Sequence, residues 1–273
     1  MSEVKVGLAL GGGGARGFAH LGVIKALREL EVPIHCVAGT SIGAIVGGVL
    51  AADTLDRALE WAAEPNWKKL PKLFLDPHLS LKALFGGRRI EKLLRQMVPA
   101  ATFEELSLPF AAVATDLMSG EEVAMRSGDV QSAMRASMAV PGLFCPVARD
   151  GRVLVDGGMV NPVPVSVCRQ LGADKVIAID LNRRGRDEPA RDYGDLNVFS
   201  VIDETCKVVM KVASSRACPY DAPDLLLAPP VGNVKMFDFH KAAELVATGY
   251  DYALTEEWDR LHGFAEFPAK KWV

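Results

Sequence analysis

The sequence lacks the features that mark exported, membrane-spanning and nucleic-acid-binding proteins. Its first residues carry the acid Glu3 and lead into a glycine cluster, so they have neither the basic start nor the long apolar core of a signal peptide. The longest apolar run, residues 42–52, is far below the roughly 20 residues that a membrane-spanning helix needs. The net charge of -3 gives no global attraction to nucleic acid. We therefore expect a cytoplasmic protein.

Disulfide, zinc and P-loop patterns are also missing. The five cysteines are odd in number and form no C-x-x-C pair, which disfavours a disulfide framework or a zinc site. No Gly-Lys-Ser or Gly-Lys-Thr sequence of the P-loop kind occurs. We therefore expect reduced thiols, and no phosphate-binding loop of that type.

What is present is the pattern of an α/β protein. The 273 residues, 49% of them hydrophobic, suffice for one large domain or two small ones. A strand at residues 4–10, a glycine loop, an amphipathic helix and a second strand at residues 35–38 make a βαβ unit. This order predicts a parallel sheet with a right-handed crossover.

The pentapeptide Gly39-Thr40-Ser41-Ile42-Gly43 stands between the second strand and an apolar helix. Gly-x-Ser-x-Gly in this context is the pattern of a nucleophile elbow, in which Gly39 and Gly43 leave room for a strained turn that exposes the serine hydroxyl. The alternative is that Thr40 or Ser41 only caps the helix. The pentapeptide alone favours neither interpretation.

The glycine loop matches G-x-G-x-x-G over residues 12–17, which is also the dinucleotide-binding pattern. A dinucleotide site requires an acid at the end of the second strand, where this chain has Ser41, so nucleotide binding is disfavoured. The backbone N–H groups of Gly12, Gly13 and Gly14 are instead candidate donors of an oxyanion hole beside the serine. Arg16 either orients this loop or an anionic ester group, or is a surface arginine.

Two kinds of base are available to Ser41. Asp156 is followed by Gly157 and Gly158 at the end of a predicted strand, and the glycines allow the carboxylate to approach other backbone closely. A Ser-Asp-His triad instead needs a later histidine, and only His240 and His262 follow Asp156. Neither histidine has a recognisable catalytic sequence around it. The alternative for Asp156 is that it belongs to an ordinary Asp-Gly turn and has no catalytic role.

The block from Ala136 to Pro141 places a helix end and a proline turn in the chain. It either packs in the core or shapes the pocket. Ser137 within it is a second possible nucleophile, but it has no flanking glycines and ranks below Ser41.

Residues 67–95 form a basic, apolar insertion that is predicted to be helical. It holds eight lysines and arginines against two acids, with leucine and phenylalanine between them. It is either a lid over an acyl-chain pocket, a surface that attracts anionic lipid headgroups, or a solvated helical face.

The glycine loop, the elbow, the Ala136–Pro141 block and Asp156-Gly157-Gly158 together resemble the sequence blocks of the patatin-like phospholipase family, in this order. The resemblance covers about residues 4–180. It implies a three-layer α/β/α sandwich with a mainly parallel central sheet and a helical lid-like insertion. It also implies hydrolysis of acyl esters in phospholipids, lysophospholipids or related lipids, with neither metal nor cofactor. The implied roles are Ser41 as nucleophile, Asp156 as base without a catalytic histidine, and Gly12, Gly13 and Gly14 as oxyanion donors.

We expect one domain over residues 1–273, with a core at about 4–180, the insertion at about 64–100 and C-terminal helices at about 200–263. The expected partner is a lipid ester, with transient contact to an anionic membrane surface through residues 67–95 and no nucleic acid. The localisation expected from this is cytoplasmic and peripheral to the membrane. The alternative function is a catalytically weak lipid-binding or regulatory protein on the same fold.

Overall fold

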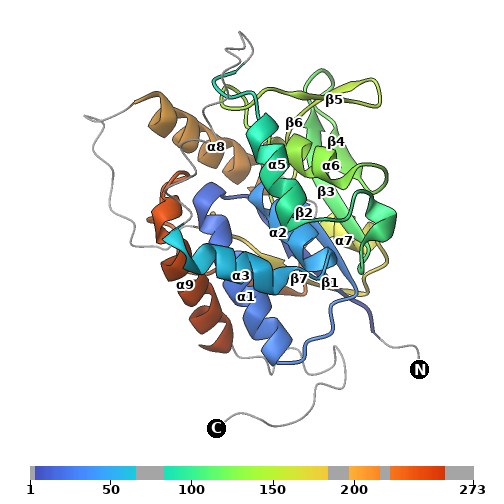
Figure 1. The fold of residues 1–273 in the computed structure, drawn as a ribbon, viewed down its shortest axis with the longest axis vertical. Helices are drawn as coiled ribbons and strands as arrows, with labels where there is room; N and C mark the ends of the chain where they lie inside the picture. Colours follow the sequence, from blue (N-terminus) through green and yellow to red (C-terminus); the bar gives the residue numbers. More distant parts are fainter. Residues whose placement is uncertain (1–3, 66–82, 184–196, 216–221, 256–273) are drawn as a thin grey trace.

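The structure is a computed structural model that describes residues 4–65, 83–183, 197–215 and 222–255. An eight-stranded sheet lies at its centre, with helices on both faces (Figure 1). The strand order is β5-β6-β3-β2-β1-β7-β8, and β4 pairs with β3 beside this path. The strands are β1 (Val6–Leu10), β2 (Cys36–Thr40), β3 (Phe110–Asp116), β4 (Glu122–Met125), β5 (Val147–Arg149), β6 (Arg152–Asp156), β7 (Lys175–Ile179) and β8 (Leu225–Leu227).

Five of these strands, β1, β2, β3, β7 and β8, run parallel, whereas β4, β5 and β6 join antiparallel at one side. In the centre, Leu8 of β1 lies opposite Val37 of β2 and Ile177 of β7. The strands β1, β2 and β3 are buried along their whole length, as expected for parallel strands covered on both faces. The predicted α/β sandwich with a mainly parallel sheet is confirmed.

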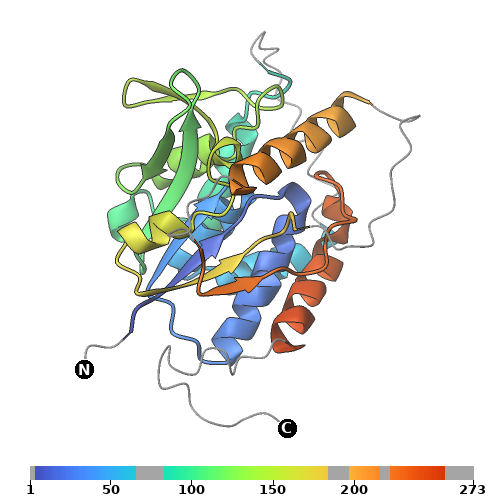
Figure 2. The ribbon, with the colours of Figure 1, turned by 180° about the vertical axis from the view of Figure 1, so that it is seen from behind.

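Helices cover the two faces unequally. Leu8 and Leu10 of β1 belong to a large core beneath most of the helices, and Ala9 between them belongs to a smaller core beneath α7. Figure 2 shows the face on which α7 lies and the end of the sheet that α8 crosses. The α-helices are α1 (Phe18–Glu29), α2 (Ile42–Ala51), α3 (Leu55–Ala63), α5 (Arg88–Met97), α6 (Val130–Ser137), α7 (Val165–Gln170), α8 (Val198–Ser215) and α9 (Ala242–Thr255), and the 3-10 turns are η1 (Gly14–Gly17), η3 (Phe103–Glu105), η4 (Gly157–Met159) and η7 (Phe239–Lys241).

The predicted insertion falls only partly within the described residues, because residues 66–82 lie outside them. Its described part contains α5, which buries Ile90 and Leu94. The opposite side of α5 exposes Arg89, Lys92 and Arg95. The helix is therefore amphipathic and packs its apolar side on the core.

The C-terminal part of the chain adds α8 and α9, within the range where helices are predicted. Helix α9 packs along α1 at very short range, because a Cβ atom added at Gly22 would collide with the Val246 carbonyl and one added at Gly249 with the Ala19 carbonyl. No described helix is both long enough and apolar enough to span a bilayer.

Candidate active site

Ser41 occupies a strained turn between β2 and α2. Its backbone has φ 57° and ψ -124°, a conformation that residues other than glycine adopt rarely and at a cost of about 1–3 kcal/mol. Its side chain makes no capping hydrogen bond to α2, and the Thr40 hydroxyl donates to the Asn161 carbonyl at 2.7 Å instead. The interpretation of these hydroxyls as simple helix caps is therefore wrong.

The two glycines of the elbow lie where no side chain fits. A Cβ atom at Gly39 would collide with the Gly43 carbonyl, and one at Gly43 would collide with the Leu10 carbonyl at the end of β1. The missing side chains thus let α2 begin directly against the end of the sheet. This close approach places Ser41 at the carboxyl ends of the parallel strands, where open α/β sheets bind their ligands.

Ser137 holds the elbow from the side of α6. It is fully buried, and its hydroxyl accepts a hydrogen bond from the Ser41 N–H at 2.9 Å and donates one to the Val113 carbonyl at 2.5 Å. Its proton is thus engaged by a backbone carbonyl. This arrangement makes Ser137 a support of the turn rather than a second nucleophile. The sequence offered no sign of this role, since the two serines are far apart in the chain.

Asp156 ends β6 and is 3% exposed. Its backbone N–H donates to the Ala139 carbonyl at 3.0 Å, and its carbonyl accepts from the Thr115 hydroxyl at 2.9 Å. Its carboxylate oxygen Oδ1 accepts from the Gly158 N–H at 2.8 Å. The Ala136–Pro141 block therefore positions the acid through a backbone carbonyl, in addition to packing in the core.

Burial raises the pKa of Asp156 to about 6, and hydrogen bonds from the Ser41 hydroxyl and the Gly158 N–H oppose part of this rise. Oxygen Oδ2 is buried and accepts no hydrogen bond of ordinary length from the described residues. At neutral pH the group is therefore a carboxylate with few compensating donors. Such a carboxylate is a stronger proton acceptor than a solvated aspartate, whose pKa is about 3.9.

The two glycines after Asp156 again mark close approaches. A Cβ atom at Gly157 would collide with the Val113 carbonyl of β3, and one at Gly158 would lie 2.5 Å from the Met210 Cε of α8. The Val113 carbonyl of β3 thus lies beside Gly157 and also accepts the hydrogen bond from the Ser137 hydroxyl.

The glycine loop lies against the elbow. A Cβ atom at Gly12 would be 3.4 Å from the Ser41 Cβ. The Gly12 N–H, however, donates to the Pro162 carbonyl at 3.0 Å, so that it is engaged within the protein. Among the described residues, the N–H groups of Gly13 and Gly14 have no backbone acceptor.

Arg16 is buried, at 3% exposure, so that its interpretation as a surface arginine is wrong. Its Nε donates to the Gly13 carbonyl at 2.9 Å, and its Nη2 lies 3.8 Å from Asp203 Oδ1 of α8. These contacts support a role in orienting the glycine loop.

The three described histidines are His20, His35 and His240. His20 is fully buried, its Nε2 lies 2.8 Å from the Gly11 carbonyl, and burial lowers its pKa to about 4. His35 accepts a hydrogen bond from the Val6 N–H, and His240 is exposed in η7. His262 lies outside the described residues. The structure thus gives Asp156, rather than His20 or His35, a contact with the Ser41 hydroxyl.

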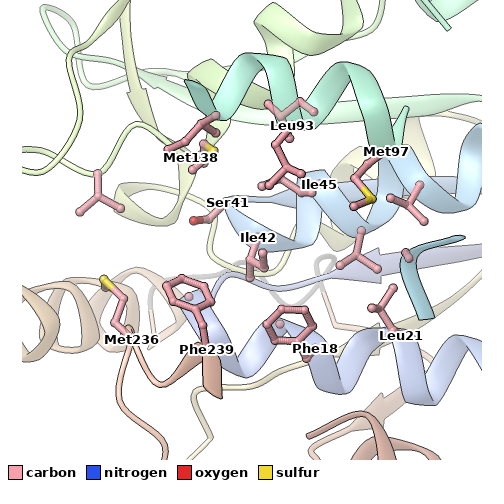
Figure 3. Close-up of a pocket in the computed structure, with 18 of the residues that line it drawn as sticks. Phe18, Leu21, Ser41, Ile42, Ile45, Leu93, Met97, Met138, Met236 and Phe239 are labelled. Atoms are coloured by element: carbon pink, nitrogen blue, oxygen red, sulfur yellow. The ribbon is translucent and has the colours of Figure 1, made fainter. Parts of the chain in front are cut away.

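An apolar pocket of about 170 Å³ opens at Ser41 (Figure 3). In the close-up, Leu93 and Met97 of α5 lie on one side, Phe18 and Leu21 of α1 on the other, and Ile45 of α2 between them. The pocket is lined by Gly14, Gly17, Phe18, Leu21, Ser41, Ile42, Ile45, Val46, Val49, Ala58, Trp61, Ile90, Leu93, Leu94, Met97, Met138, Val140, Leu143, Phe144, Met236, Phe237 and Phe239.

Metal-ligating side chains do not gather in the part of the chain that the structure describes: no group of three or more His, Cys, Asp or Glu residues there has an arrangement that could hold a metal ion. Four of the five cysteines lie in this part, and all four are free thiols: Cys36, Cys145, Cys168 and Cys206.

Comparisons with known proteins agree on one family. The family model described as patatin-like phospholipase matches residues 8–169. An NTE family protein of Mycobacterium tuberculosis is 44% identical over 191 residues, which cover 70% of this chain and 52% of that protein. The human patatin-like phospholipase domain-containing protein 6 is 31% identical over 290 residues, which cover 93% of this chain and 20% of that protein. The chain thus spans about half of the mycobacterial relative and a fifth of the human one.

The fold comparison agrees. The crystal structure of VipD from Legionella pneumophila has a TM-score of 0.64 over 96% of this chain and 67% of that chain, at 14% sequence identity. At this identity the likeness concerns the fold alone. Because the family model covers more than half of the chain, and a relative above 30% identity aligns with nearly all of it, the chain belongs to the patatin-like phospholipase family.

Proposed function

We propose that this protein is a serine acyl hydrolase that cleaves carboxylic ester bonds of phospholipids, lysophospholipids or related lipids. The observation that carries the proposal is the buried pair of Ser41 and Asp156, of which Ser41 lines an apolar pocket. Membership of the patatin-like phospholipase family supports the same reaction class.

In the proposed reaction, the Ser41 Oγ attacks the ester carbonyl carbon while Asp156 takes the proton of the Ser41 hydroxyl. The tetrahedral intermediate expels the alcohol, which leaves with the proton from Asp156, and an acyl group stays on Ser41. A water molecule then gives its proton to Asp156 and attacks the acyl carbon. The fatty acid is released, and Ser41 recovers its proton.

The negative charge of each tetrahedral intermediate needs backbone donors. Of the three predicted donors, the Gly12 N–H already donates to the Pro162 carbonyl. We therefore propose the N–H groups of Gly13 and Gly14 as the oxyanion donors. Gly14 also lines the pocket together with Ser41. A carbonyl oxygen bound there would lie in the same space as the reacting serine.

The wall of the pocket favours an acyl chain as its occupant, because its lining residues are almost all apolar. Ile45 lies one helical turn beyond Ser41, and tryptophan at this position would fill the space. We expect Ile45→Trp to lower kcat/KM for p-nitrophenyl octanoate by at least about tenfold, the loss expected when two methylenes at about 0.8 kcal/mol each are no longer buried. Turnover of p-nitrophenyl acetate should change less than twofold.

The matched control for this experiment is Val208→Trp, which introduces the same ring on the exposed side of α8, where Val208 is 61% exposed. It should leave both esters unaffected. Equal losses for octanoate and acetate in Ile45→Trp would contradict the assignment of the pocket to the acyl chain.

We further propose that the cationic side of α5 faces anionic lipid headgroups. Arg89, Lys92 and Arg95 are exposed on this helix, whose other side lines the pocket with Leu93 and Leu94. Each basic residue near an anionic membrane contributes about 1 kcal/mol of attraction. Lys92→Glu should therefore reduce sedimentation with phosphatidylglycerol vesicles. Equal sedimentation of the unaltered protein with phosphatidylcholine and phosphatidylglycerol vesicles would contradict this proposal.

A further inference from the structure

Three consecutive carbonyl oxygens of the glycine loop, residues 11–14, accept hydrogen bonds from side chains. The donors come from α1, from the turn η1 and from the segment after β7. Gly11, Gly12 and Gly13 are buried, so their carbonyls need hydrogen-bond partners from the protein in place of water. The three bonds are 2.8 Å from His20 Nε2 to Gly11 O, 2.7 Å from Asn182 Nδ2 to Gly12 O and 2.9 Å from Arg16 Nε to Gly13 O.

These bonds fix the direction of the N–H groups on the other side of each peptide. A trans peptide is planar, and its carbonyl and N–H point in opposite directions. The Gly13 N–H is therefore directed away from Asn182, and the Gly14 N–H away from Arg16. The flanking N–H groups are engaged, since Gly12 donates to the Pro162 carbonyl and Ala15 to the Met236 carbonyl. The two N–H groups proposed as oxyanion donors are thus the two in this loop that have no backbone acceptor among the described residues.

Asn182 reaches the loop because β7 and β1 are parallel neighbours. Ile179 at the end of β7 pairs with Leu10 at the end of β1, so that the segments after both strands meet at one edge of the sheet. The Asn182 backbone is itself fixed, because its N–H donates to Asp180 Oδ1 at 2.8 Å. Its Nδ2 also lies 3.5 Å from the Met210 sulfur of α8.

We propose that Asn182 is a positioning residue for acyl transfer, which holds the Gly12–Gly13 peptide so that the Gly13 N–H faces the oxyanion. The assignment rests on the proposed function. Glycine on both sides of this peptide leaves its rotation nearly free in the absence of a clamp. His20 supports the preceding peptide as a neutral imidazole, because burial lowers its pKa to about 4. An oxyanion site stabilises charge only when its donors are already oriented, which is what the Asn182 side chain supplies.

The first test is Asn182→Ala, measured with p-nitrophenyl butyrate. Removing one direct oxyanion donor costs about 10²–10³-fold in kcat, and loss of a residue that orients such a donor should cost about 10–10²-fold. KM should change less than twofold, since the ester itself does not contact Asn182. A trifluoromethyl ketone, which forms a tetrahedral oxyanion adduct with serine, should bind more weakly by the same factor as kcat/KM falls.

The second variant separates the hydrogen bond from packing. Asn182→Asp keeps the shape of the side chain but places an acceptor opposite the Gly12 carbonyl. It should lower kcat at least as much as Asn182→Ala, although it preserves more of the packing. A purely structural role for Asn182 predicts the reverse order.

The control is Asn197→Ala. Asn197 is exposed at the start of α8, where its Oδ1 accepts a hydrogen bond from the Ser200 N–H at 3.0 Å, away from the glycine loop. This variant should retain kcat within twofold. All variants are compared at a temperature at which circular dichroism shows them folded.

Two results would overturn the assignment while the hydrolase function stands: a kcat for Asn182→Ala within twofold of the unaltered enzyme, or a milder loss in Asn182→Asp than in Asn182→Ala. An unaltered protein that neither hydrolyses esters nor reacts with a fluorophosphonate overturns the proposed function, and the assignment with it. Three results together support the assignment: a lower kcat at constant KM in Asn182→Ala, weaker binding of the ketone, and a kcat of Asn182→Asp that is no higher than that of Asn182→Ala.

Discussion

Turnover of p-nitrophenyl butyrate is expected to fall by about 10³–10⁶-fold when Ser41 is replaced by alanine. Ser41 is the nucleophile of the proposed reaction, and the neighbouring Thr40 hydroxyl donates to the Asn161 carbonyl. The Gly13 and Gly14 N–H groups and the apolar pocket stay intact, so that binding of the ester should be nearly unchanged. The loss should therefore be in kcat, measured under saturating ester, and not in KM.

The fold should survive this substitution. Alanine tolerates φ 57° about as poorly as serine does, and the Ser41 N–H still donates to the Ser137 hydroxyl. The thermal midpoint should thus stay within a few degrees of the unaltered protein. Ser132→Ala, in the first turn of α6, is the matched control and should leave turnover unchanged. Retention of more than a tenth of the activity in Ser41→Ala would contradict the role of Ser41 as nucleophile.

Replacing Asp156 with asparagine should lower kcat by about 10²–10⁴-fold, the usual contribution of a general base. Asparagine keeps the size of the side chain and can still accept the hydrogen bond from the Gly158 N–H, but it cannot take the proton of Ser41. Asp116→Asn is the matched control, because Asp116 is a buried acid on the neighbouring strand β3. Near-normal turnover in Asp156→Asn, together with inactivity of His240→Ala, would replace the dyad by a triad.

The raised pKa of Asp156 gives this prediction a pH dependence. The base must be ionised, so kcat/KM should rise with pH and level off above about pH 6 in the unaltered enzyme. The folded state also binds this proton more tightly than the unfolded state, in which the pKa is about 3.9. The contribution of Asp156 to stability is therefore largest below about pH 4 and is lost as the pH rises through 6.

The thermal midpoint of Asp156→Asn follows from the same argument. At pH 7.5 the variant lacks a buried charge and should melt at the same temperature as the unaltered protein or higher. Below pH 4 the difference should disappear, because the aspartic acid is then neutral in both states. A strongly lowered midpoint at pH 7.5 would indicate that Asp156 acts through stability instead of catalysis.

Local patterns in the sequence sufficed for much of the fold, whereas the reactive pair is a prediction that rests on the resemblance to the patatin-like family. Runs of apolar residues predicted β1 and β2. Gly39 and Gly43 predicted a tight turn, and in the structure a Cβ atom at either glycine would collide with a backbone carbonyl. The pairing of Ser41 with Asp156 rested on the joint motifs, since β3 lies between β2 and β6 in the sheet. No spacing in the chain predicts such a neighbourhood.

Other parts of the site depend on contacts that span the chain. Gly12, Gly13 and Gly14 are the same residue type, and the Gly12 N–H differs from the other two by its hydrogen bond to the Pro162 carbonyl, which lies far along the chain. The sequence allows Arg16 to be a surface residue, because its burial depends on contacts with Gly13 and with Asp203, which lies far along the chain. Ser137, and Asn182 in the role proposed for it, act through side-chain hydrogen bonds to backbone groups far along the chain, and such bonds leave no pattern in a sequence.

The central claim is that Ser41 is a nucleophile activated in its buried elbow, and covalent labelling tests it most directly. We expect a fluorophosphonate to add one adduct, found by peptide mass spectrometry on Ser41. The adduct should be absent in Ser41→Ala and should form far more slowly in Asp156→Asn. An unlabelled native protein, or an adduct on Ser137 in place of Ser41, would contradict the account.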